Sequence, residues 1–240
     1  MRSHALQLKT FATLLNADGT PVFRNQLLGH IWKPEDRITI TVSNPDGSID
    51  RTYEQPMRSF NRNFMILLKE AMTSEASESC QDTSNATKGG TNVQPAVSNT
   101  VMAATSVTNY GIQIGTGSTA AAPADYALET LIADGNGTGQ MEYAAMAKTA
   151  PAEDGTNYEM ILQRTFNNAS GATITVKETG LTIMYDKTPD VYFLLARDVL
   201  NGATGVDVTN GQNITITYTI YTTNNSGFTK NFINGLYEFF

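Results

Sequence analysis

The sequence has few of the residues from which metal sites and nucleophilic sites are usually built. Among its 240 residues there is one cysteine, Cys80, and there are two histidines, His4 and His30. A single cysteine excludes both a disulfide within the chain and a cysteine-based metal motif. No G-x-S-x-G motif marks a nucleophile, and the histidines form no metal-ligand pair. We therefore expect no enzyme, no catalytic residue, no metal site and no cofactor.

Charge and long apolar runs are also scarce. Charged residues make up 16% of the chain, the net charge is −7, and the basic residues are scattered singly. This distribution disfavours nucleic acid as the main partner. No stretch approaches the ~20 consecutive apolar residues of a membrane helix, and the N-terminus lacks the apolar core of a signal peptide. We expect a soluble protein that is made in a cytoplasm and has no membrane partner.

The sequence does contain the hydrophobic patterning that is typical of β-strands. Hydrophobic residues make up 40% of the chain, enough for a packed core. Between residues 100 and 225, short apolar segments alternate with turns rich in Gly, Asn and Asp. The candidate strands cover 100–107, 109–117, 139–150, 157–168, 172–186, 190–200 and 212–223. Strands at this spacing predict a mainly β fold, an antiparallel β-sandwich or jelly-roll-like body, with one or two short amphipathic helices.

The region before this body, residues 1–73, is predicted to be a β-hairpin region followed by a helix. Ile38, Ile40 and Val42 alternate, the turn falls at residues 44–47, and the pattern resumes at Ile49. Apolar residues between 60 and 72 then recur at helical spacing, with Ser59 as the expected N-cap. Residues 74–99 show no periodicity and are predicted to form a polar extended loop, ordered by contacts within an assembly.

A short pattern occurs twice in the chain. Residues 60–68 read FNRNFMILL and residues 228–236 read FTKNFINGL, which share F-x-[RK]-N-F-[MI]-x-x-L. The two copies would lie side by side on the sandwich, or one would reach a neighbouring subunit; coincidence is the third reading. We predict that 226–240 is a helical docking segment. The candidate interface residues are Phe60, Phe64, Leu68, Phe228, Phe232, Leu236, Tyr237, Phe239 and Phe240.

Residues 115–120 spell G-x-G-x-x-A, the pattern of a dinucleotide-binding loop. That function needs a helix directly after the loop within a parallel βαβ unit, and Pro123 interrupts such a helix. We interpret Gly115 and Gly117 as residues that permit a turn, with positive φ as one expected reason for glycine. Residues 124–132 are expected to form a short helix or an irregular crossover, and the Gly-rich stretch 134–139 to form a turn.

The order of several motifs resembles that of predicted structural proteins of tailed bacteriophages. The motifs are YGIQIGTGSTAAAPADYALETLI with GTGQMEYAA behind it, RTFNNASGATITVKETGL, and FLLARDVL followed by VTNGQNITITYTI. The resemblance covers roughly 100–240 and, through the helix, 58–72. It implies a β-sandwich in a virion component that is made in the host cytoplasm, with no catalytic residues to carry over. Its partners would be copies of itself and other virion proteins.

Within the virion, the low charge, the polar stretch and the apolar C-terminus favour a tail or head–tail connector subunit. A capsid decoration protein is the alternative, and a receptor-binding or carbohydrate-binding tail-fibre module is a third possibility.

Overall fold

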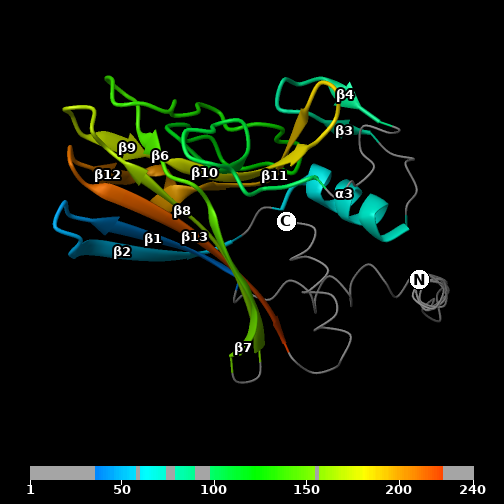
Figure 1. Cartoon of the computed structure of the whole chain (residues 1–240), viewed down its shortest axis with the longest axis horizontal. Helices are drawn as coiled ribbons and strands as arrows, with labels where there is room; N and C mark the ends of the chain where they lie inside the picture. Colours follow the sequence, from blue (N-terminus) through cyan, green and yellow to red (C-terminus); the bar gives the residue numbers. More distant parts are fainter. Residues whose placement is uncertain (1–35, 58–59, 74–78, 90–97, 155–156, 224–240) are drawn as a thin grey trace.

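The computed structural model describes residues 36–57, 60–73, 79–89, 98–154 and 157–223. Two antiparallel sheets form the body (Figure 1). The strands are β1 Arg37–Ser43, β2 Ile49–Pro56, β3 Cys80–Gln81, β4 Thr87–Lys88, β5 Gly111–Gly115, β6 Glu142–Tyr143, β7 Ala147–Asp154, β8 Asn157–Asn167, β9 Ile174–Val176, β10 Glu178–Tyr185, β11 Val191–Val199, β12 Val206–Val208 and β13 Asn213–Thr223. The one α-helix in the described residues is α3, Arg62–Thr73, and a short 3₁₀ turn, η2, spans Leu200–Ala203.

The larger sheet has the strand order β2-β1-β13-β8-β6, with β7 also paired to β8. The smaller sheet has the order β11-β10-β5, and β12–β9 and β3–β4 form separate pairs. All these strand pairs are antiparallel. The mainly β, sandwich-like fold predicted from the sequence is therefore confirmed.

The core lies between the two sheets. In the larger sheet it follows the period-2 alternation of the strands, whereas β5, β10 and β11 of the smaller sheet are buried on both faces. In β1, Ile38, Ile40 and Val42 are fully buried while the residues between them are half-exposed. The β13 side chain opposite Ile38 is Tyr218, whose hydroxyl reaches Thr179 of the smaller sheet at 3.4 Å. This contact shows that the two sheets face each other across the core. Because one face of β1 and of β13 is turned to this core, apolar residues alternate along both strands, and this alternation located them in the sequence.

The hairpin predicted before the helix is present where the structure describes it. The turn between β1 and β2 is closed by a hydrogen bond of 2.9 Å from the Gly47 amide to the Asn44 carbonyl. Gly47 has a φ of +83°, which favours glycine there. The part of the predicted N-terminal region before residue 36 lies outside the described residues.

Two local predictions were wrong. Residues 100–107 form no strand; Thr100 makes one isolated bridge to Met184, and the following segment is irregular. Residues 124–132 form an irregular crossover without helix, which is one of the two arrangements expected there. Within the predicted polar loop 74–99, residues 80–88 form the β3–β4 hairpin, whose turn is held by the Asp82 carboxylate. The prediction failed because polar residues usually indicate a loop, whereas here the Asp82 side chain accepts backbone amides of the turn and so stabilises a hairpin.

Helix α3 begins later than predicted, because Asn61 and not Ser59 caps it. The Asn61 Oδ1 accepts the Phe64 amide hydrogen at 3.1 Å, which is the N-cap geometry. Ser59 lies outside the described residues. Phe64 and Leu67 are fully buried, so the predicted apolar face of the helix does pack against the body. No helix in the described residues is long and apolar enough to cross a membrane.

Candidate functional site

The crossover 116–131 covers the outer face of the smaller sheet. Leu181 and Ile183 of β10 belong to the core, so Glu178 and Gly180 on the alternate positions point away from it. The crossover leaves β5 and returns beside it, with a hydrogen bond of 2.9 Å from the Thr116 amide to the Thr130 carbonyl. Its G-T-G end and its D-Y-A-L-E segment are therefore brought together over β10.

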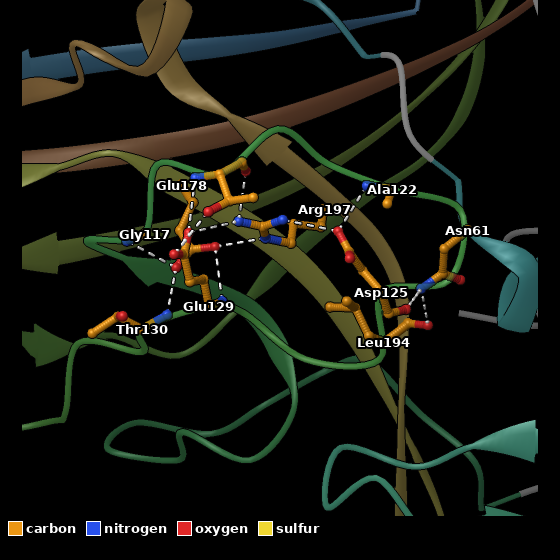
Figure 2. Close-up of polar contacts among 10 residues, drawn as sticks. Asn61, Gly117, Ala122, Asp125, Glu129, Thr130, Glu178, Leu194 and Arg197 are labelled. Atoms are coloured by element: carbon orange, nitrogen blue, oxygen red, sulfur yellow. Dashed lines mark hydrogen bonds and ion pairs between the residues drawn. The ribbon is translucent and has the colours of Figure 1, made fainter.

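A buried carboxylate fastens the two ends of this crossover. Glu178 is fully buried, and its Oε1 accepts the backbone amides of Gly117 at 3.0 Å and Thr130 at 2.8 Å. Its Oε2 accepts the Glu129 amide at 3.1 Å and the Arg197 Nε–H at 2.7 Å. Figure 2 shows these four donors converging on the one carboxylate. Such a set of donors compensates for the loss of water around a buried charge.

Arg197, from β11, connects this carboxylate to two further acids. Its side chain is 4% exposed, and Nη1 donates to Asp125 Oδ2 at 2.8 Å. Nη2 donates to the Thr119 carbonyl at 3.0 Å and lies 3.4 Å from Glu129 Oε2. Burial alone would lower the pKa of Arg197, but the hydrogen bonds to Asp125 and Glu178 outweigh it and raise the pKa. We call Arg197, Glu178, Asp125 and Glu129 the Arg197 clamp.

Glu129 and Asp125 hold the crossover from its solvent side. Glu129 accepts hydrogen bonds from the amide and hydroxyl of Thr119, at 2.8 and 2.9 Å. These bonds, the amide first, hold the pKa of Glu129 below its usual range. Asp125 Oδ2 also accepts the Ala122 amide at 2.9 Å. Both acids of the D-Y-A-L-E segment therefore have assigned structural contacts.

The same crossover binds the N-terminus of helix α3. Asn61 Nδ2 lies 2.8 Å from both the Asp125 carbonyl and the Leu194 carbonyl of β11 (Figure 2). The Arg62 amide, one of the unpaired donors at a helix start, donates to the Pro123 carbonyl at 2.8 Å. Asn61 thus caps the helix and joins it to the clamp. The helix, the crossover and the sheet are held as one unit.

The asparagine that the F-x-[RK]-N-F pattern specifies, Asn63, also anchors the helix. Asn63 Nδ2 donates to the Gln81 carbonyl at 2.7 Å, and its Oδ1 accepts the Gln81 amide at 3.1 Å. The rings at the two aromatic positions of the pattern, Phe60 and Phe64, contact each other with centroids 4.1 Å apart and planes tilted by 34°. In this copy the pattern therefore fixes the helix to the β3–β4 hairpin and to the core.

The interface candidates in this copy lie against the chain's own body. Phe64 is fully buried, and Phe60 and Leu68 are half-buried against the core. The other candidates, Phe228, Phe232, Leu236, Tyr237, Phe239 and Phe240, lie outside the described residues. Contact between subunits through either copy stays a prediction.

The arrangement has the chemistry of a structural anchor. In a nucleotide-binding loop, backbone amides of the Gly-rich turn and the following helix hold a phosphate. Here the Gly117 amide is turned to Glu178, and the anion it binds belongs to the protein. Within the described ranges, no group of three or more His, Cys, Asp or Glu side chains is placed to hold a metal ion.

The glycines of the motif are required for a reason different from the expected one. Neither Gly115 nor Gly117 has a positive φ. A Cβ on Gly117 would instead lie 2.4 Å from the Glu129 Cβ and 2.5 Å from Glu178 Oε1. A Cβ on Gly115 would lie 2.5 Å from the Thr130 carbonyl oxygen. Glycine is needed because the two ends of the crossover approach each other closely.

Gly117→Ala is accordingly expected to lower the free energy of unfolding by about 1–3 kcal/mol, the usual cost of forcing extra volume into a packed site. Gly137→Ala is the control, because its Cβ would meet only the end of the flexible Gln140 side chain. Urea denaturation measures both. Equal denaturation midpoints for the two variants would contradict the close-approach argument.

A separate measurement tests the interpretation that this loop binds no nucleotide. Calorimetric titration of the wild type with ATP or NAD should give no heat of binding.

Sequence reasoning missed the central members of the clamp. Glu178 and Arg197 lie in segments whose apolar neighbours indicated ordinary core strands. The available signal was a charged residue inside an otherwise apolar strand, as in FLLARDVL, because such a residue is buried only when it is paired. Nothing in the sequence indicates which partner it takes.

Comparison with known proteins adds no family to these observations. No protein-family model, curated protein or solved structure matches the chain.

Proposed function

We propose that this protein is a non-enzymatic structural subunit of a tailed-phage virion, which assembles through contacts with copies of itself and with other virion proteins. A tail or head–tail connector position is favoured. The resemblance of its motif order supports this proposal, as do the low charge content and the apolar C-terminal sequence.

The observation that carries the structural part of the proposal is the Arg197 clamp. Its ionic groups are the most conspicuous candidates for chemistry in the described chain, and they bind one another and the backbone instead of leaving a free reactive group. Arg197 and Glu178 are almost wholly buried, so a substrate cannot reach their contacting atoms. A loop fastened in this way supplies a rigid surface, and rigidity lowers the entropic cost of forming an interface.

Among the described strands, one edge of the larger sheet supports assembly through faces rather than through strand pairing. β2 forms that edge and carries Asp50, Arg51, Glu54 and Pro56. Charges and proline on an edge strand oppose the addition of another strand. Ordered contacts between subunits would therefore use loops, helix surfaces or termini.

The symmetry of the assembly tests the proposal. The purified full-length chain, alone and mixed with virion proteins encoded beside it, would be examined by light scattering and electron microscopy. Closed rings, or copies placed on a tail axis, are expected. Copies in icosahedral number on a capsid shell would favour the decoration alternative. A protein that stays monomeric and is absent from purified particles would contradict both.

Deleting residues 228–240 is predicted to prevent oligomerisation or incorporation while the β body still folds. The segment contains aromatic residues that each bury about 150–250 Å² when packed, and its loss would remove several kcal/mol of contact at ~25 cal/mol per Å². Circular dichroism checks the fold and light scattering checks the mass. Replacing Lys230 alone with Gln, which leaves the apolar residues in place, is the control. Normal assembly of the truncated chain would show that the docking role is wrong.

A further inference from the structure

A cavity of about 380 Å³ lies beside the clamped crossover. Cavities that bind small molecules begin at about 300 Å³, so this one suits a small ligand. It is lined by Thr83, Thr108, Asn109, Gln113, Ala127, Leu128, Leu131 and Tyr192. These residues come from the β3–β4 hairpin, the segment before β5, β5 itself, the crossover and β11. Asn109 and Leu131 are exposed, which places them where the cavity meets solvent.

The lining is uncharged and exposes more apolar than polar surface. Hydroxyl and amide groups alternate with Ala127, Leu128 and Leu131, and none of the described residues that form the wall is ionic. A phosphorylated or carboxylate ligand would lose its hydration without gaining an ion pair. A neutral ligand with several hydroxyl groups would instead find donors and acceptors beside apolar surface.

The deepest polar group is fixed in place. Gln113 is 6% exposed; its Oε1 accepts the Thr182 hydroxyl at 2.6 Å, and its Nε2 donates to the Thr108 carbonyl at 2.5 Å. An amide nitrogen has two hydrogens, so one remains for a ligand. Among the described residues, no protein group hydrogen-bonds the side chains of Thr83 or Asn109.

The aromatic member of the lining is also held. Tyr192 stacks on Tyr110, with centroids 6.2 Å apart and planes 13° apart. Its carbonyl accepts the Thr83 amide at 2.9 Å, which joins the β3–β4 turn to β11. Leu128 is fixed over Gly180, where a Cβ would lie 2.8 Å from its Cδ2. A rigid ring next to aliphatic groups offers a preorganised apolar surface.

We propose that this cavity binds one neutral pyranose unit. A pyranose presents C–H groups on its faces, which pack on an aromatic ring, and hydroxyl groups around its edge, which pair with amides and hydroxyls. The Tyr192 ring, the Gln113 and Asn109 amides and the Thr83 hydroxyl supply these groups within one small cavity. The inference does not depend on where the protein sits in a particle.

Saturation-transfer NMR on the full-length protein tests this proposal. The probes are the methyl α-glycosides of glucose, galactose, mannose and N-acetylglucosamine, which resemble the end of a glycan chain, and the corresponding free sugars. Glucose 6-phosphate is the charged counterpart. At least one neutral glycoside should bind with a dissociation constant of about millimolar, as expected for few contacts in a small site, and the phosphorylated sugar should not. Binding of the glycoside but not of the free sugar would identify a glycan terminus as the source.

The variants decide where the sugar binds. Tyr192→Ala and Asn109→Ala should each weaken binding, the former at least tenfold, and Tyr192→Phe should retain it because the ring remains. Ala127→Phe, which adds volume to the wall, should abolish binding and serves in place of Tyr192→Ala if that variant does not fold. Asn136→Ala, an exposed asparagine outside the cavity, is the control. Absence of binding by every sugar, or binding equal in Asn109→Ala, Ala127→Phe and wild type, would overturn the proposal.

Discussion

Replacing Arg197 with methionine is expected to lower the free energy of unfolding by about 3–5 kcal/mol, the cost of breaking a buried ion pair by removing one partner. The variant leaves Glu178 fully buried with three backbone donors and no positive charge. It also removes the bond that connects Asp125 to β11. Since whole domains are stable by only about 5–15 kcal/mol, the loss would be large in a urea titration.

Arg37→Met provides the matched control. Arg37 lies 3.9 Å from Glu54, but the two side chains are 43% and 61% exposed. Exposed pairs contribute about 0–1 kcal/mol, so this variant should lose little. Equal losses for Arg37→Met and Arg197→Met would contradict a special role for the clamp.

A double-mutant cycle separates the interaction free energy between Arg197 and Glu178 from the general loss of stability in each single variant. Glu178→Gln alone replaces one of the two acceptor oxygens with an NH2 group, which faces hydrogen-bond donors whichever way the amide is turned, and it removes the negative charge that pairs with Arg197. The combination of Arg197→Met and Glu178→Gln should lose at least about 1 kcal/mol less than the sum of the single variants, because neither buried charge then remains. Strict additivity would show that the two side chains act independently.

The sequence predicted best where local pattern and tertiary contact agree. The β1–β2 hairpin and strands β8 and β13 follow alternation and turn residues, because one face of each strand packs on a common core. In contrast, the strand predicted over 172–186 is divided into β9 and β10, and β12 was not predicted. The helix was placed by the spacing of Phe60, Phe64 and Leu67. Its cap was misplaced because Asn61 is preferred through its tertiary bonds to Leu194 and Asp125, which no local rule contains.

The clamp could not be predicted because its members are brought together only by the complete fold. Asp125 and Glu129 lie on the crossover, and Glu178 and Arg197 lie on two adjacent strands. The G-T-G motif was expected to permit a turn, but Gly115 ends β5 and Gly117 lies in an irregular segment, and neither has a positive φ. Its close approach to Glu129 depends on where β10 carries Glu178. The strand predicted at residues 100–107 could not be judged from local pattern either, because a side chain from a distant part of the sequence binds carbonyls of this segment.

That side chain is Arg164, a fully enclosed residue of β8. Its guanidinium is 3.3 Å or less from each of five backbone carbonyl oxygens, those of Ala104, Val107, Tyr110, Ile112 and Ala144. It also lies 4.8 Å from the centre of the Tyr143 ring. Burial lowers the pKa of Arg164 to about 10, so the group is still charged at neutral pH. The carbonyls that a strand at 100–107 would have used in a ladder are therefore partly satisfied by this one cation.

Arg164→Met is expected to cost at least about 4 kcal/mol, since each buried acceptor left without a donor costs about 1–3 kcal/mol and several are orphaned together. Arg164→Lys is the discriminating variant: it keeps the charge, but an ammonium has three donors and lacks the planar geometry that reaches both ends of the segment. It should lose an intermediate amount. Wild-type stability in Arg164→Lys would mean that charge alone suffices.

Amide hydrogen exchange supplies a local test of the same prediction. The Ala103 amide bonds to the Val101 carbonyl and the Ser106 amide to the Tyr143 carbonyl, so both report on segment 101–110. In Arg164→Lys these amides should exchange faster, while amides of β1, which β13 separates from β8 in the larger sheet, stay protected. Uniform acceleration across the chain would show that Arg164 stabilises the whole fold without specifically ordering this segment, and the explanation for the missing strand would then fail.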